Sequence, residues 1–259
     1  MFDNLLFAHE GAIARLTLNR PQSLNALNRS LLEDLRRAVQ RTADDPRVRV
    51  VVITGAGDRA FAAGADLHEL AGMAAVDMRR YSELGQQVFA SIENLGKPVL
   101  AALNGIAVGG GCELAMACTV RIAADTVRLG QPEVNLGLMP GFSGTQRLAK
   151  LVGRGRALDL LLTGRQIDAA EALRIGLVER VTAPGSLDDE VHALASTLAA
   201  KPPLAVRSIL DAVRRGAEMP AAGANALEAS LFGMLGTTTD MREGTRAFLD
   251  KRIPTFKGE

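Results

Sequence analysis

Hydrophobic and polar positions recur at two different periods along the first part of the chain. Residues 12–19, AIARLTLN, alternate apolar and polar side chains, which predicts a half-buried β-strand. A helical spacing of leucine and valine follows, and it predicts a helix that is capped by Asn28 or Ser30 and ends near Thr42. The β-branched run over residues 48–54, VRVVVIT, is typical of a buried strand in a mostly parallel sheet. This order of elements indicates an α/β fold.

The alternation of strand and helix continues to the middle of the chain and then gives way to helices. The next predicted elements are a helix over 78–94, a strand over 99–103, a helix over 110–118 and a strand over 120–124. After Pro140 the predicted elements are helices over 144–152, 155–162, 168–175, 187–200, 204–216 and 220 to about 250. The break at Lys201-Pro202-Pro203 therefore predicts an α/β core over 1–200 and a helical C-terminal region over 201–259.

Composition and charge exclude several classes of protein. The 259 residues are 47% hydrophobic and carry 30 basic and 29 acidic side chains, with no tryptophan and one tyrosine, so we expect a globular protein that does not bind nucleic acid. Cys112 and Cys118 have no CxxC or histidine partner, which argues against a metal site or a disulfide framework. The start, MFDNLLFAHE, lacks a basic signal region, and no apolar run approaches the roughly 18 residues that span a bilayer. We expect a cytoplasmic protein without a membrane segment.

Two glycine-containing stretches follow the strand that ends near Thr54. Residues 55–60, GAGDRA, match the G-x-G-x-x-A form of a dinucleotide-binding motif, which makes a dinucleotide-binding oxidoreductase one alternative function. The motif needs a helix to open inside it, and only Asp77 is available as a ribose-binding acid, so a plain glycine turn is favoured. Residues 60–67, AFAAGADL, place small side chains where a ligand could approach the backbone.

The stretch GGGCELAMAC, residues 109–118, places three glycines and one carboxylate at the start of a predicted helix. The first N–H groups of such a helix are unpaired and unobstructed, which favours an anion. Glu113 falls in the first turn, and a second acid, Glu133, follows in an apolar setting between Pro132 and Val134. Two carboxylates in different environments suit acid–base chemistry on one substrate. The residues alone leave open that the glycines serve close packing and that both glutamates cap helices or face solvent.

Six motifs in order give the chain an overall resemblance to the enoyl-CoA hydratases of the crotonase family. They are LTLNRP with LNALN, AFAAGADL, KPVLAALNGIAVGGGCELAMAC, GQPEVNLGLMPGFSGTQRL, LLTGRQIDAAEALRIGLV and REGTRAFLDKRIPTFKG. The resemblance implies a crotonase-like spiral of ββα units with a helical C-terminal trimerisation region. It also implies a homo-oligomer, either a trimer or a dimer of trimers, and an acyl-CoA substrate.

The resemblance further implies reversible addition of water across the 2,3 double bond of a 2-enoyl-CoA, which gives a 3-hydroxyacyl-CoA in fatty-acid or related acyl-CoA degradation. By the same resemblance, the backbone N–H groups of Ala65 and Gly110 are expected to form the oxyanion hole for the thioester. Glu113 is expected to deprotonate the water, and Glu133 to protonate the α-carbon. The residues implied to contact the substrate and its CoA part are Ala63, Gly64, Ala65, Asp66, Leu67, His68 and Gly110. Neither a metal nor a redox cofactor is implied.

The chain departs from the family pattern at PGFSGTQ, where PGAGGTQ is more usual. Phe142 and Ser143 therefore replace small residues near the acyl pocket, and either they alter the usual short-chain preference or Phe142 packs away from the site. Two other activities of the same family stay open, an enoyl-CoA isomerase and a hydratase for ring or branched acyl-CoA. Because isomerases tend to keep only one of the two glutamates, the presence of both Glu113 and Glu133 favours hydration.

Overall fold

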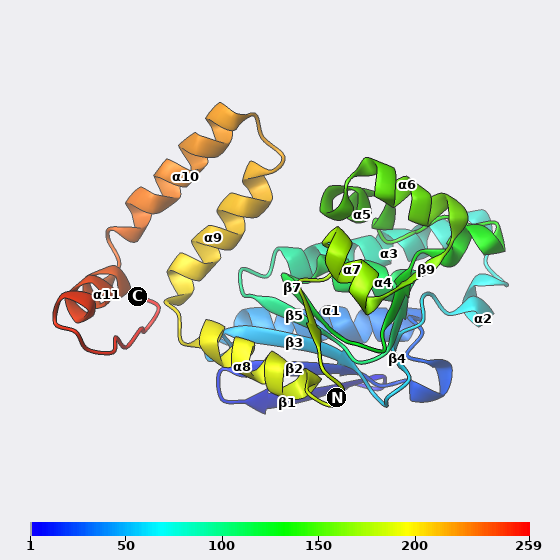
Figure 1. Cartoon of the computed structure of the whole chain (residues 1–259), viewed down its shortest axis with the longest axis horizontal. Coiled ribbons are helices and arrows are strands. Elements are labelled where there is room, and N and C mark those ends of the chain that lie inside the picture. Colours follow the sequence, from blue (N-terminus) through cyan, green and yellow to red (C-terminus); the bar gives the residue numbers. More distant parts are fainter. Residues whose placement is uncertain (1) are drawn as a thin grey trace.

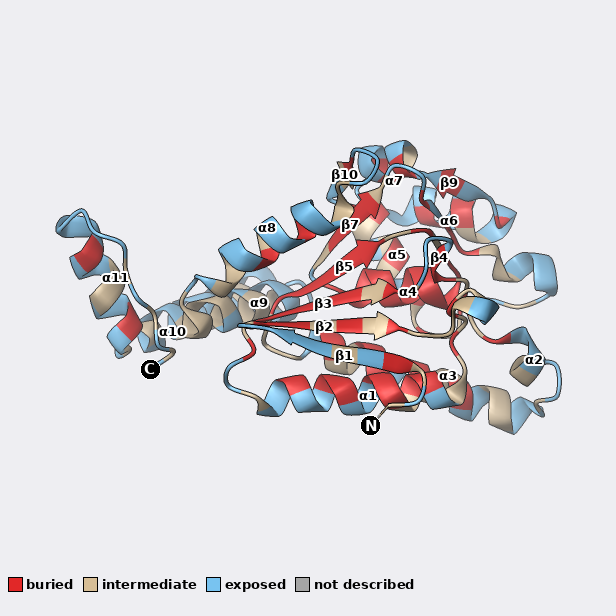
Figure 2. Ribbon diagram, turned by 90° about the horizontal axis from the view of Figure 1, so that it is seen from below, coloured by how far each residue is buried: buried red, intermediate tan, exposed pale blue. Residues whose placement is uncertain are grey.

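The larger of two β-sheets forms the base of the fold in the computed structural model, which describes residues 2–259. Its strand order is β1-β2-β3-β5-β7-β10, and every neighbouring pair is parallel except β1 with β2. The strands are β1 (Leu5–Glu10), β2 (Ile13–Leu18), β3 (Val50–Gly55), β5 (Val99–Leu103), β7 (Val120–Ala124) and β10 (Arg180–Thr182). Figure 2 shows the inner strands buried along most of their length and β1 exposed at the edge. The mostly parallel sheet predicted from the apolar runs is confirmed.

A second, smaller sheet has the order β4-β6-β8-β9. Its strands are β4 (Ala60–Ala62), β6 (Ile106–Val108), β8 (Arg128–Gly130) and β9 (Gln166–Asp168). Each of β4, β6 and β8 follows directly after β3, β5 or β7 of the larger sheet. Each turn of the chain therefore adds one strand to each sheet before a helix begins, which confirms the expected spiral of ββα units.

Helices cover both faces of the larger sheet. The α-helices of the described residues, not all of which touch this sheet, are α1 (Arg29–Asp44), α2 (Leu67–Leu70), α3 (Ala75–Glu93), α4 (Gly110–Ala117), α5 (Gly144–Val152), α6 (Arg154–Thr163), α7 (Ala169–Ile175), α8 (Leu187–Ala199), α9 (Pro203–Gly216), α10 (Ala221–Leu235) and α11 (Thr239–Leu249). Because successive side chains of a strand point to opposite faces, Val51 and Ile53 join the main core, while Val50 and Val52 pack with Val191 of α8. Of the two caps predicted for α1, Asn28 is confirmed, because its side chain accepts a hydrogen bond from the Leu31 N–H, whereas Ser30 lies within the helix.

Helices α9, α10 and α11 stand apart from the two sheets, as Figure 1 shows. The chain leaves α8 at residues 200–202, and α9 begins at Pro203. The prediction of one helix from 220 to about 250 is wrong, because α10 ends at Leu235 and α11 begins after Thr238, whose side chain caps the new helix by accepting from the Met241 N–H. Along residues 2–259, no helix combines the length and the apolar character that crossing a membrane requires.

Candidate active site

Three loops meet at one edge of the smaller sheet. Strands β4, β6 and β8 are parallel neighbours, so their carboxyl ends lie side by side. The loop after β4 contains Gly64 and Ala65, the loop after β6 contains Gly109 and Gly110, and the segment after β8 contains Glu133. Residues that are far apart in the sequence are therefore brought together by strand pairing.

The backbone amides of Ala65 and Gly110 lie in adjacent loops and are available to a ligand. A Cβ on Gly64 would lie 3.8 Å from the Gly110 nitrogen. Among residues 2–259, neither amide donates a hydrogen bond to a protein acceptor. Leu27 fixes the first loop, because its N–H donates to the Gly64 carbonyl at 2.8 Å and its carbonyl accepts from the Asp66 N–H at 3.0 Å. Two unpaired donors held this way can bind an oxygen that gains negative charge.

The three consecutive glycines meet three different requirements. Gly109 has a φ of 52°, and a Cβ there would lie 3.0 Å from Oε1 of Glu133. A Cβ on Gly110 would lie 3.0 Å from the Phe142 ring. On Gly111 it would lie 1.9 Å from the Ala62 carbonyl oxygen, so this glycine allows α4 to pack against β4. Close packing of the helix against the sheet, the alternative explanation of the motif, therefore applies to Gly111.

Glu113 lies in the first turn of α4 with 1% of its surface exposed. Its Oε1 accepts hydrogen bonds from the backbone N–H groups of Phe142 at 2.8 Å and Gly144 at 2.6 Å. These two donors were not anticipated from the sequence. The only signal for them is the glycine at 144, where a Cβ would lie 2.7 Å from the same carboxyl oxygen. The loop before α5 therefore fixes the Glu113 carboxyl, and Glu113 neither faces solvent nor caps its helix.

Glu133 is half-buried in the short helix Pro132–Leu136 that follows β8. Burial raises the pKa of its carboxyl to about 7. Within residues 2–259 it forms no ion pair with lysine, arginine or histidine. Its neutral form is therefore favoured more than that of an ordinary glutamate.

The pKa of Glu113 is also raised, mainly by burial and secondly by the negative charge of Glu133, while the N–H donors of Gly144 and Phe142 oppose the rise. Two nearby carboxylates in a buried site cannot both ionise at low cost, so the pair retains one proton near neutral pH. The two backbone donors stabilise the charged form of Glu113. When Glu133 holds the proton, its repulsion of Glu113 also disappears. Burial nonetheless outweighs these donors and raises the pKa of Glu113 to about 8, so both carboxyl groups hold protons more readily than an ordinary glutamate.

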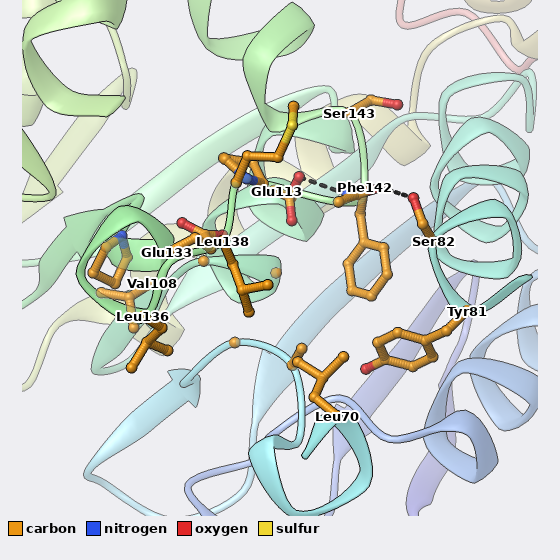
Figure 3. A pocket seen from close by; sticks show the side chains of 18 of the residues that line it. Leu70, Tyr81, Ser82, Val108, Glu113, Glu133, Leu136, Leu138, Phe142 and Ser143 are labelled. Carbon is orange, nitrogen blue, oxygen red and sulfur yellow. Dashed lines mark hydrogen bonds between the residues drawn. The ribbon is translucent and has the colours of Figure 1, made fainter. Parts of the chain in front are cut away.

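A cavity of about 630 Å³ opens beside these groups. Figure 3 shows Glu113 and Glu133 on one side of it, with Leu70 and Tyr81 across from them. Leu70, Met78, Leu136 and Met139 make the lining largely apolar. A pocket of this size with a few convergent polar groups is typical of a small-molecule site.

Phe142 both lines this cavity and belongs to the core, with 3% of its surface exposed. Its ring packs edge-to-face against Tyr81 at 5.2 Å and Phe89 at 5.5 Å. It also fills the space that a Cβ on Gly85 would need, at 2.2 Å from the ring. Ser143 also lines the cavity, has a φ of 74° and is the N-cap residue directly before α5. Phe142 therefore forms a wall of the cavity and does not pack away from the site.

The residues predicted to contact CoA divide into two groups. Ala63, Gly64, Ala65, Leu67 and Gly110 line the cavity. Asp66 and His68 do not, because the Asp66 carboxylate pairs with Arg20 at 2.9 Å and His68 lies exposed on α2. Their contact with CoA stays a prediction.

The GAGDRA stretch does not have the structure of a dinucleotide-binding motif. It runs from the end of β3 into β4, and no helix opens within residues 55–60 of the described chain. A dinucleotide fingerprint requires that helix for the pyrophosphate. The glycine-turn interpretation is the one that fits.

Known proteins resemble this chain along nearly its whole length. The family model for enoyl-CoA hydratase/isomerase matches residues 8–259. A crotonyl-CoA hydratase of Syntrophomonas wolfei is 46% identical over 255 residues, which cover 98% of each chain. A short-chain-enoyl-CoA hydratase of Clostridium acetobutylicum is 43% identical over 256 residues, again 98% of each chain. The crystal structure of an enoyl-CoA hydratase from Bacillus anthracis aligns with a TM-score of 0.97 at 39% identity and covers 99% of this chain and 100% of that one.

The two-sheet spiral and the cavity with its two carboxyl groups define an enzyme of the crotonase fold. The chain belongs to the enoyl-CoA hydratase/isomerase family, and its full-length relatives identify it as an enzyme of the enoyl-CoA hydratase type. The resemblance inferred from the six motifs is thereby confirmed.

Proposed function

We propose that this enzyme adds water to the 2,3 double bond of a short-chain 2-enoyl-CoA, with Glu113 as the base and Glu133 as the acid. The thioester oxygen accepts hydrogen bonds from the N–H groups of Ala65 and Gly110. Glu113 removes a proton from water while the water oxygen attacks C3. The electrons of the double bond move to the thioester oxygen, and the resulting enolate takes a proton at C2 from Glu133. The reverse sequence removes water from the 3-hydroxyacyl-CoA.

The observation that carries this proposal is the presence of one buried carboxyl group, one half-buried carboxyl group and two unpaired amides around one apolar cavity. The amide of Gly110 lies at the positive end of α4, which adds to the stabilisation of the enolate. Each donor of an oxyanion hole contributes about 3 kcal/mol to lowering such a barrier. The proposal needs no metal or redox cofactor, because the thioester and these donors supply the activation.

Loss of the enoyl-thioester absorbance of crotonyl-CoA, without any added cofactor, tests the proposal. The expected product is 3-hydroxybutyryl-CoA, identified by mass. An enzyme that leaves crotonyl-CoA unchanged but moves the double bond of a 3-enoyl-CoA would instead be the isomerase alternative. Absence of both activities across a panel of acyl-CoA thioesters would refute the proposal.

Phe142 stays in the wall of the cavity, and we propose that it alters the usual preference by strengthening it, because its ring and that of Tyr81 close one side of the cavity to a longer acyl chain. Phe142→Ala is expected to shift the ratio of kcat/KM for 2-decenoyl-CoA over crotonyl-CoA upward by about tenfold or more, since several methylene groups gain buried space. Phe89→Leu, which alters a ring that packs behind Phe142 and does not line the cavity, is the matched control. An unchanged ratio in Phe142→Ala would contradict the assigned preference.

We also propose that the chain assembles as a trimer or a dimer of trimers through α9–α11, and that it works in the cytoplasm. Large apolar side chains are exposed on these helices, among them Phe232 at 80% and Phe248 at 84%. Apolar surface of this extent is usually covered by a partner. Light scattering of the purified enzyme gives the assembly, and a monomer at micromolar concentration would contradict it.

A further inference from the structure

The side chain of Gln131 lies next to the proposed acid and is almost completely buried, with 1% of its surface exposed. It comes directly after β8 and precedes the short helix that carries Glu133. With the amide nitrogen turned toward Glu133, Nε2 lies 3.0 Å from Oε1 and 3.2 Å from Oε2 of the carboxyl. No other side chain among residues 2–259 lies within hydrogen-bonding distance of that carboxyl.

A turn of the amide by 180° exchanges its oxygen and nitrogen. In the first orientation Nε2 donates to both oxygens of an ionised Glu133, whereas in the second the amide oxygen faces the same carboxyl. An amide oxygen repels a carboxylate but accepts a hydrogen bond from a neutral carboxylic acid. Each orientation therefore fits one protonation state of Glu133.

The other side of the amide fits only the first orientation, because the groups there are donors, and the amide oxygen faces them when Nε2 faces Glu133. Cys112, a buried residue of α4, has its thiol on this side. Burial raises the pKa of this thiol to about 12, so it keeps its proton at neutral pH. A neutral thiol is a weak donor, which suits the amide oxygen that faces it in the first orientation. The titratable groups that face Glu133 from α4 are thus Cys112 and Glu113, and neither is a cation.

From this arrangement we infer that Gln131 is a positioning residue that donates to Glu133 and stabilises the carboxylate that forms when Glu133 gives its proton to C2. The inference rests on the proposed function, which requires Glu133 to be neutral before it protonates C2 and ionised afterwards. Gln131 itself does not line the cavity, so it acts through Glu133 and not on the substrate.

Replacement of the amide by an apolar group of similar size tests this role. In Gln131→Met the carboxylate of Glu133 loses the N–H donors of the amide. Hydrogen bonds to a charged acceptor are stronger than those to a neutral one, so we expect the pKa of Glu133 to rise by about one unit. The kcat for crotonyl-CoA at pH 7 should fall about tenfold, with KM within about twofold of the parent value. Infrared titration measures the pKa directly, and the Glu133 band is the one absent from Glu133→Gln.

Thr182→Val is the matched control, because it removes a buried polar group of β10 that bonds only the Ala123 carbonyl, at 3.5 Å, outside the cavity. It should keep the parental Glu133 pKa and kcat. If Gln131→Met does not fold, Gln131→Asn retains an amide but withdraws it by one carbon, and the pKa should move in the same direction. A Glu133 pKa within about 0.3 units of the parent in the folded variant would overturn the inference, since a lost charged hydrogen bond predicts more.

The two measurements separate this inference from the proposed function. A parent enzyme that hydrates crotonyl-CoA, together with an unmoved Glu133 pKa in the variant, would overturn only the role of Gln131. A parent enzyme without hydratase activity, together with a raised pKa in the variant, would overturn the proposed function and leave the contact between Gln131 and Glu133 supported.

Discussion

Glu133→Gln is expected to stabilise the protein above neutral pH while it removes most of the activity. Burial raises the pKa of Glu133 from the usual 4.5 to about 7, so the folded protein holds a proton that the unfolded chain releases between these values. The free energy of unfolding of the parent therefore falls as the pH rises through this window. A shift of this size corresponds to about 3 kcal/mol at pH 8, and relief of the repulsion with Glu113 acts in the same direction. Glutamine does not ionise and avoids this cost.

Denaturant unfolding of the parent and of Glu133→Gln at pH 5 and pH 8 measures the effect. The variant should gain up to about 3 kcal/mol at pH 8 and less than about 1 kcal/mol at pH 5. Its kcat should fall by roughly 10²- to 10⁴-fold, the usual contribution of one positioned acid. Asp125→Asn is the control, because Asp125 is exposed and forms no ion pair within the described residues. Equal stability of parent and variant at both pH values would refute the burial argument, and kcat within about threefold of the parent would refute the assigned role.

Three further changes test other parts of the structure. Gly110→Val places a branched side chain against Phe142 and disturbs the adjacent N–H, so kcat should fall by about 10²- to 10³-fold, and parental turnover would contradict the oxyanion role. Gly111→Ala brings a Cβ to 1.9 Å from the Ala62 oxygen, so thermal melting should show loss of the folded protein, and an unchanged Tm would refute the packing. Truncation after Ala200 removes α9–α11 and should yield aggregated protein in gel filtration, whereas a soluble active monomer would contradict their proposed role in assembly.

Elements set by local sequence could be predicted with their bounds. Strands β5 and β7 have the predicted limits, because a continuous apolar run ended by a turn marks a strand that is buried on both faces. The cap of α1 was found for the same reason, since Asn28 bonds an N–H only three residues away. The predicted helix over 220–250 is two helices, because Thr238 caps a new helix within a stretch whose pattern is otherwise helical.

The short strands of the smaller sheet could not be predicted. Strands β4, β6, β8 and β9 have three residues each, too few to show a period of two, and they become strands only by pairing with segments far along the chain. The same limit applies to the site. The motifs indicated Glu113 and Glu133, but the amides that hold Glu113 come from residues 29 and 31 positions away. Such contacts follow from the path of the chain and not from local composition.

The connections between the two sheets determine where the catalytic groups lie. Asn25, fully buried with a φ of 56°, donates its amide to the carbonyls of Ala56 at 3.0 Å and Ala60 at 2.9 Å, and so fixes the corner between β3 and β4. Asn104, in the corner between β5 and β6, donates to the Gly55 carbonyl at 2.9 Å and joins the two corners. Strands of three residues have little stability alone. The hydrogen bonds of these two asparagine amides therefore fix the short strands relative to the long buried strands that precede them. The larger sheet thus stabilises the smaller one, and the hydrogen bonds at the corners fix the loops that contain Ala65, Gly110 and Glu133.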